Sequence, residues 1–426
     1  MSSRTDPART DAARADAVRT DTTRMITAED KSFPAALAGR DAAALEEPLG
    51  SFSTPLLVLD GPGMAHNLQV MADWVAERGL ELMPHGKTTM APVLWHRQLA
   101  AGATGITVAT GWQADVALRA GVPTVQIANM CLDPALLRRL DEWLAEHPEQ
   151  ELVCWADSLA AVDLMEQELP EGSRVGVLVE LGADGGRTGA RTESEALAIA
   201  QRLAASPVLT LRGVSGYEGG ARPRPQRGRA RGRAQLLRAP RRPRSLGAGD
   251  DRGRRLDHRR RQRLSGPRRR RDRRGARHPR GAPLGAYIVH DSGFYRGISP
   301  LDRDRGLPAA DALLPAMRAY ARVVSQPEPA LALLDAGKRD VPFDEGLPVP
   351  LAVAGALGGP QRPLDAEVTA LNDQHTFLRW EGEAPAAIGD VVTLGLSHPC
   401  TAFDKWRLIP VVDAEGIVTE AVETLF

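Results

Sequence analysis

Short apolar runs alternate with amphipathic helical stretches from Ser53 to about residue 220. The predicted strands are PLLVLD from Pro55, LELMPH from Leu80, GITVAT from Gly105, TVQIANM from Thr124, LVCWAD from Leu152 and VGVLVELGA from Val175. Nearly continuous apolar strands that alternate with helices are typical of a parallel sheet covered by helices. Six such strands favour a closed (β/α)8 barrel, which presents its reactive side chains at the carboxyl ends of the strands.

After about Leu313 the pattern changes to short strands separated by Gly, Pro and Asp turns. These strands are ALALLDAG, AEVTALND, HTFLRWEG, DVVTLGLSHPC and RLIPVVD. We therefore predict a barrel over residues 46–312, followed by a β-domain over residues 313–426. Residues 1–24 repeat Ala, Arg, Asp and Thr without apolar periodicity, so we expect a disordered tail, extending to residue 45. Met25 is an alternative translation start.

The composition predicts a soluble cytoplasmic protein without a membrane segment. A chain of 426 residues is long enough for two domains with ordinary cores. Its three cysteines lie far apart, which argues against a disulfide framework. The sequence has neither an apolar run of transmembrane length nor the apolar core of a signal peptide.

The formal net charge of zero conceals a strongly basic segment. Residues 221–283 contain 25 arginines, no lysine and four acidic residues. The rest of the chain has 29 basic and 50 acidic residues, a net charge of −21. The segment shows neither helical nor strand periodicity, and it interrupts the predicted barrel. Basic arms that bind nucleic acid usually lie at a terminus or in a linker.

Two motifs suggest chemistry. In MPHGKTTMAP, Lys87 follows a predicted strand and is one of four lysines beside 50 arginines. A lysine amine can lose its proton and react covalently, whereas an arginine cannot; the alternative is a solvated loop lysine. In SHPCTAFDKW, His398 and Cys400 are two positions apart at a predicted strand end, so we expect their side chains to share a face. Imidazole and thiolate together suit Zn²⁺.

These motifs resemble those of the fold-type III pyridoxal-phosphate enzymes related to D-serine dehydratase and D-threonine aldolase. PHGKT is similar to that family's lysine signature, and HPCTAFDKW is similar to its zinc-binding motif. The intervening segments ELGADGGRTGAR, GVSGYEG, GAYIVHDSGFY and LDAGKRDVPFDEGLP agree as well. The resemblance covers residues 50–220 and 284–426, and it implies an alanine-racemase-like barrel followed by a metal-binding β-domain.

The resemblance also implies roles for individual residues. Lys87 would carry pyridoxal 5'-phosphate and act on the Cα proton, with His85, Arg187 and Tyr217 around the cofactor. For Arg187 and Tyr217, surface or core roles remain open. His398 and Cys400 would hold Zn²⁺. His375 is either a further contact or, more simply, a structural histidine of the β-domain.

The implied reaction is dehydration of a D-3-hydroxy amino acid, D-serine or D-threonine, to a 2-oxo acid and ammonia. The alternative is retro-aldol cleavage, as in D-threonine aldolase. Two further alternatives are a non-catalytic pyridoxal-phosphate carrier and a nucleic-acid binder based on the arginine tract. Relatives with a β-domain lead us to expect a homodimer.

A reading-frame error explains the arginine tract best. Read one base out of frame with permissive codon choice, HRRRQRLSG encodes TAGGSAYPD, which resembles the family's Gly-Gly-Ser loop. Other parts of the tract give family-like segments at the same offset. Because the chain as written lacks barrel elements and this phosphate-side loop, we expect it to fold poorly and to have little activity.

Overall fold

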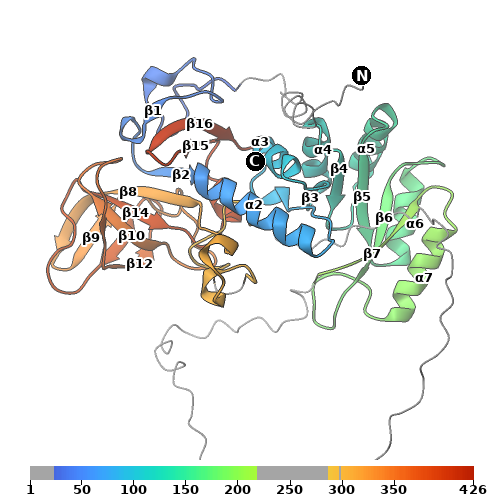
Figure 1. Ribbon diagram of the computed structural model, residues 1–426. Helices are drawn as coiled ribbons and strands as arrows, with labels where there is room; N and C mark the ends of the chain where they lie inside the picture. The colour runs from blue at the N-terminus through green and yellow to red at the C-terminus, as the bar shows by residue number, and fades with distance from the viewer. Residues whose placement is uncertain (1–23, 218–285, 297–298) are drawn as a thin grey trace, which may run out of the picture.

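Two sheets organise the chain in the computed structural model, which describes residues 24–217, 286–296 and 299–426 (Figure 1). One is a parallel sheet in the order β3-β4-β5-β6-β7. Its strands are β3 (Ile106–Val108), β4 (Thr124–Ile127), β5 (Glu151–Ala156), β6 (Gly176–Leu181) and β7 (Thr210–Gly216). The helices that connect them are α4 (Gly111–Arg119), α5 (Pro134–Glu146), α6 (Leu159–Glu168) and α7 (Glu193–Ala204). The strand–helix alternation predicted from Gly105 onward is confirmed.

One face of this sheet packs against its helices. Val177 and Val179 of β6 share an apolar cluster with Leu140 of α5 and Val162 of α6. Because side chains alternate along a strand, Leu178 and then Glu180 face the opposite side, which in a barrel is the inside. Each connecting helix begins at a side chain that accepts a hydrogen bond from the backbone amide three residues on. These N-caps are Thr110, Asp133, Ser158 and Thr192.

The second sheet is largely antiparallel and contains the C-terminal part of the chain. Its main path runs β1-β16-β15-β2-β8-β14-β10-β11, and β9, β13 and β12 branch from β8. The bounds are β1 (Glu47–Pro48), β2 (Leu56–Asp60), β8 (Met317–Glu328), β9 (Leu331–Leu334), β10 (Val349–Ala354), β11 (Arg362–Pro363), β12 (Glu367–Leu371), β13 (Thr376–Arg379), β14 (Val391–Gly395), β15 (Leu408–Val412) and β16 (Ile417–Glu423). The five β-domain strands predicted from the sequence are all present.

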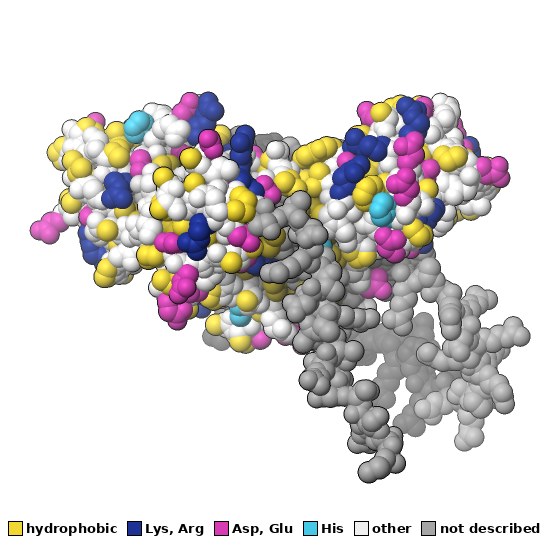
Figure 2. Space-filling model, turned by 90° about the horizontal axis from the view of Figure 1, so that it is seen from above, with side chains coloured by type: hydrophobic (Ala, Val, Ile, Leu, Met, Phe, Trp, Pro, Cys, Tyr) yellow, Lys and Arg dark blue, Asp and Glu magenta, His cyan; other side chains and the backbone are white. Residues whose placement is uncertain are grey.

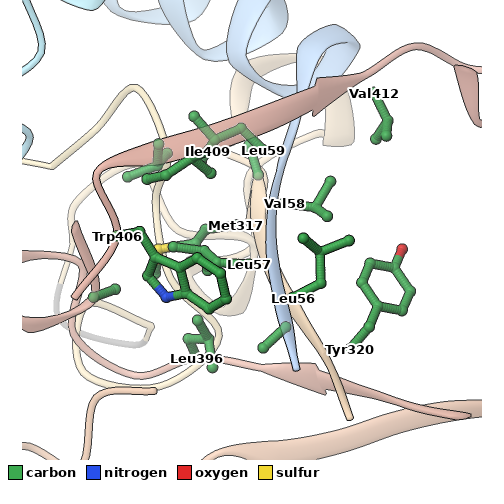
Figure 3. Close-up of a cluster of buried hydrophobic side chains, with 14 of the residues drawn as sticks. Leu56, Leu57, Val58, Leu59, Met317, Tyr320, Leu396, Trp406, Ile409 and Val412 are labelled. Carbon is green, nitrogen blue, oxygen red and sulfur yellow. The ribbon is translucent and has the colours of Figure 1, made fainter. Parts of the chain in front are cut away.

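The strand β2 corrects one prediction. We expected PLLVLD to belong to the barrel, but β2 pairs antiparallel with β8 and parallel with β15 in the second sheet. Leu56 and Leu57 are fully buried there, among Met317, Trp406 and other apolar side chains (Figure 3). A run buried on both faces carries no signal of which sheet it joins. After β2, α2 (Gly61–Glu77) and α3 (Pro92–Ala100) lead toward the parallel sheet (Figure 1).

The N-terminal segment is a second correction. Residues 24–45, expected to be part of a disordered tail, pack on the second sheet. Ile26 and Leu37 are buried, and the carbonyl of Ala42 accepts a hydrogen bond from the Ala421 amide of β16. The few apolar side chains between polar residues are enough to cover this sheet edge. Residues 1–23 lie outside the described residues.

Two other predictions concern the barrel. The predicted strand LELMPH is reduced to a parallel bridge between His85 and Thr107 of β3. The arginine tract at 221–283, and the units expected there, lie outside the described residues. On the face seen in Figure 2, acidic and basic side chains are interspersed over the coloured part of the chain. Among the described helices, none is long and apolar enough to cross a membrane.

Candidate active site

Lys87 lies on a short 3-10 turn, η3 (Gly86–Thr88), directly after the bridge that His85 forms with β3. The carbonyl of Gly86 accepts a hydrogen bond from Trp95 Nε1 at 3.2 Å, which anchors the turn to α3. Lys87 is half-buried. The structure thus holds this amine at the carboxyl end of a strand segment, as the sequence predicts for a reactive lysine.

His85 stands close to two positive charges. Burial, together with the positive charges of Lys87 and Arg187, lowers the pKa of His85 to about 4. The imidazole is therefore neutral at physiological pH. Because both charges act on His85, Arg187 lies near the lysine turn, although it is 100 positions from Lys87 in the sequence.

The loop after β6 contributes Arg187 and a buried carboxyl group. The Arg187 guanidinium lies 4.6 Å from the ring centroid of Tyr217, which is 45% exposed at the end of β7. Thr188 Oγ1 donates a hydrogen bond to Glu180 Oε1 at 3.0 Å. Burial raises the pKa of Glu180. A small pocket is lined by Glu180, Leu181, Gly182, Ala183, Arg187, Thr188 and Tyr217.

His398 and Cys400 do meet, but not through the strand geometry that we expected. β14 ends at Gly395, and Cys400 begins the one-turn helix α8 (Cys400–Phe403). The two side chains are hydrogen-bonded, and this bond, together with that to Asp344, raises the pKa of His398 to about 9. Burial alone would raise the pKa of Cys400, but hydrogen bonds with His398 and Thr88 lower it overall. Both shifts favour a protonated imidazole beside a thiolate.

The lysine turn touches this pair directly. Thr88 Oγ1 lies 3.3 Å from Cys400 Sγ, although the two residues are 312 positions apart. The positive charge of Lys87 also contributes to the lowered pKa of Cys400. The two motifs recognised separately in the sequence thus form one site.

Sequence reasoning assigned no role to Asp291 or Tyr295. The segment that carries them pairs with the end of β14, since Ser292 N donates to Leu396 O and Phe294 N donates to Ser397 O. Asp291 Oδ1 accepts hydrogen bonds from the amides of Gly293 and Tyr295 at 3.1 and 2.8 Å. Burial raises the pKa of Asp291 to about 7, and the charge of His398 opposes this shift.

Tyr295 lies within electrostatic range of both Tyr217 and Cys400. Burial raises the pKa of Tyr295, and the negative charges of Cys400 and Asp291 and a charged Tyr217 raise it further. These interactions put the phenol within electrostatic range of all three groups. His375, by contrast, is exposed at the turn between β12 and β13, where its carbonyl accepts a hydrogen bond from the Asn372 amide.

Several buried polar atoms at this site have no hydrogen-bond partner within the described part of the chain. They are His85 Nδ1, Trp155 Nε1, Glu180 Oε2 and Asp291 Oδ2. Trp155 and Glu180 stand at the carboxyl ends of β5 and β6. Because buried polar atoms are normally paired, this arrangement fits a bound polar group on the inner side of the sheet. In residues 24–217, 286–296 and 299–426, no three His, Cys, Asp or Glu side chains are grouped to hold a metal.

Comparisons with known proteins agree with this division of the chain. Residues 59–244 match the family model of the alanine racemase N-terminal domain, and residues 316–412 match that of a serine dehydratase domain. The chain belongs to the fold-type III pyridoxal-phosphate family. The expected fold class, an alanine-racemase-like α/β domain followed by a β-rich domain, is confirmed. Within this family, the curated relatives that this chain matches are aldolases and a dehydratase of D-3-hydroxy amino acids.

Individual relatives represent both reactions. D-threonine aldolase of Arthrobacter sp is 28% identical over 392 residues, which are 88% of this chain and 93% of the aldolase. D-threo-3-hydroxyaspartate dehydratase of Delftia sp. (strain HT23) is 28% identical over 157 residues, 37% of this chain and 40% of the dehydratase. Among solved structures, D-threonine aldolase from Filomicrobium marinum has a TM-score of 0.64 at 19% identity, covering 90% of this chain and 98% of its own. The Delftia dehydratase has a TM-score of 0.54 at 18% identity, covering 89% and 99%.

Proposed function

We propose that this protein dehydrates a D-3-hydroxy amino acid, D-serine or D-threonine, to a 2-oxo acid and ammonia. Pyridoxal 5'-phosphate would be attached to Lys87, and Zn²⁺ would be held by His398 and Cys400. The observation that carries the proposal is the contact between Thr88 and Cys400, which joins the lysine turn to the imidazole–thiolate pair. The small-molecule amino acid substrate follows from the family.

The residues present fit both groups. Lys87 supplies an amine, the neutral His85 and the cationic Arg187 flank it, and unpaired buried atoms stand nearby. The loop expected at the cofactor phosphate lies in the arginine tract, outside the described residues. His398 and Cys400 are two zinc-type donors, which would leave the remaining positions to water or substrate. A cysteine-to-alanine variant of the related dehydratase has been solved in the metal-free form, which supports a metal in this family.

Each group supplies a distinct chemistry when bound: the cofactor withdraws electrons from Cα, and the metal acts as a Lewis acid on the substrate hydroxyl. The amine of Lys87 would remove the Cα proton. Asp291 keeps its own carboxyl proton up to about pH 7, and it would donate this proton to the departing hydroxyl oxygen. A proton donor at the hydroxyl favours dehydration, whereas retro-aldol cleavage needs a base there.

D-threonine aldolase activity is the second candidate. It is favoured by the match to the Arthrobacter aldolase, which spans nearly the whole of both chains. The histidine and cysteine motif does not exclude this reaction, because a metal at the hydroxyl can also promote loss of its proton. A homodimer remains a prediction.

Product analysis with D-threonine distinguishes the two reactions. Dehydration yields 2-oxobutyrate and ammonia, and aldol cleavage yields glycine and acetaldehyde. From a protein with the reading frame restored across the arginine tract we expect the first pair of products, with no turnover in its Lys87→Arg variant. Glycine with acetaldehyde would establish the aldolase instead. The assay should be run on the chain as written and on a version with the reading frame restored across residues 220–284. Absence of both product pairs in the restored protein would refute the proposal.

A further inference from the structure

Asp344 contacts the candidate metal site from a loop to which sequence reasoning assigned no role. We propose that Asp344 is a positioning residue that fixes the tautomer and orientation of His398, so that Nε2 of its ring is available to a divalent metal. This inference rests on the proposed function, since it concerns the same imidazole–thiolate pair.

Both oxygens of the Asp344 carboxylate are engaged on the segment that carries the pair. Oδ2 lies 2.6 Å from His398 Nδ1, and Oδ1 accepts a hydrogen bond from Thr401 Oγ1 at 2.7 Å. Two bonds to two different side chains fix the plane of the carboxylate. The Phe294 ring, with its centroid 5.7 Å from that of His398, flanks the imidazole as well.

The loop that carries Asp344, between β9 and β10, is anchored beside the pair. Ser397 Oγ donates to Gly346 O at 2.8 Å, on the other side of Asp344 from Phe343. The Phe343 ring lies 5.6 Å from Lys338 Nζ and 6.0 Å from Lys405 Nζ. Contacts on both sides of Asp344 therefore hold its carboxylate in place before any metal binds.

The chemistry of the carboxylate determines the state of the ring. An ionised carboxylate only accepts hydrogen bonds, so when the ring gives up one proton to bind a metal, the remaining proton stays on Nδ1 and the lone pair of Nε2 is left for the metal. Metal-binding histidines commonly donate their second ring N–H to such an acceptor, and loss of that partner typically weakens metal binding about 10–100-fold. An amide in place of the carboxylate can donate to Nδ1 and so stabilise the opposite tautomer, with the proton on the ligand nitrogen.

Titration of the cofactor-loaded protein with Co²⁺ tests this, because a thiolate bound to cobalt gives a charge-transfer absorption band. We expect the unaltered protein to bind one Co²⁺ with this band, and Cys400→Ser to lose it. Asp344→Asn should weaken cobalt affinity about 10–100-fold, with the band restored at saturation. Asp344→Glu should recover part of the affinity, and Thr401→Val should lose several-fold.

Glu345→Gln is the matched control. It removes the same charge one position away, at a residue that is not among the described contacts of His398. We expect its cobalt affinity to lie within about twofold of that of the unaltered protein. Equal urea midpoints would establish that the variants are folded; if Asp344→Asn fails to fold, Thr401→Val decides. Unchanged cobalt affinity in the folded variants would refute the role of Asp344 alone. No cobalt band in the unaltered protein would refute the proposed metal site itself.

Discussion

Gly86 leaves almost no room for a side chain beside Lys87. A methyl group at this position would lie 2.5 Å from Ile106 Cγ2 and 2.7 Å from Trp95 Nε1. Both neighbours are fully buried, so neither can swing into solvent. Ordinary carbon contacts need about 3.5–4.0 Å, and Gly86→Ala must therefore shift the turn or its neighbours by about 1 Å. Overpacking of this kind typically costs about 1–3 kcal/mol.

Urea denaturation of the Gly86→Ala protein measures this cost. A loss of 1–3 kcal/mol, at an m-value of about 3 kcal/mol/M, lowers the midpoint by about 0.3–1 M. Because the same shift displaces Lys87, we expect turnover to fall by about 100-fold. Gly355→Ala is the control: its new methyl group meets nothing within 4 Å, and its backbone lies outside the left-handed region, so stability should be unchanged or slightly higher. Equal midpoints for the two variants would refute the packing argument.

Three other predictions follow from the site. Borohydride reduction followed by peptide mass spectrometry should find the cofactor on Lys87, and Lys87→Arg should abolish this label; a label on another lysine would contradict the assignment. Burial raises the pKa of Asp291 from 3.8 to about 7, so the folded chain holds a proton that the unfolded chain releases in this range. The unaltered protein should therefore lose stability relative to Asp291→Asn as the pH rises from about 4 to 7, by at most about 1.4 kcal/mol per unit, and a flat difference would show that Asp291 titrates normally. Restoring the reading frame across residues 220–284 should raise both the urea midpoint and the turnover of D-serine; equal values would argue against a frame error.

Most strands of the described α/β part could be predicted because each is a short, isolated apolar run. GITVAT and VGVLVELGA, for example, became β3 and β6. The assignment of β2 failed because four consecutive buried residues look the same in either sheet. β8, whose sequence MRAYARVVSQPE mixes buried and partly exposed positions without a regular period, was not predicted. Its arginines and proline interrupt the apolar pattern, and only its pairing with β2, β9 and β14 makes it a strand.

The candidate site could be predicted where the residue types are rare. Lys87 is one of four lysines, and Cys400 is one of three cysteines. Asp291 and Asp344 were not assigned roles because a carboxylate among 54 acidic residues carries no such signal. Asp344 is 54 positions from His398, and it acquires its importance only when the loop between β9 and β10 reaches the end of β14. The segments VHDSGFY and VPFDEG were recognised as family-like, but only the structure gives their carboxylates partners.

The boundaries of the arginine tract in the sequence limit which residues a frame error there can change. On one side, β7 ends at Gly216, and Tyr217 lies against Arg187. On the other side, the chain re-enters at residues 286–296, where the backbone pairs with the end of β14 and brings Asp291 near His398. A frame error confined to residues 220–284 would thus leave every side chain of the candidate site encoded correctly. It would remove only the barrel units and the phosphate-side loop between them. The same catalytic residues would then be present, but the protein would bind its cofactor much more weakly.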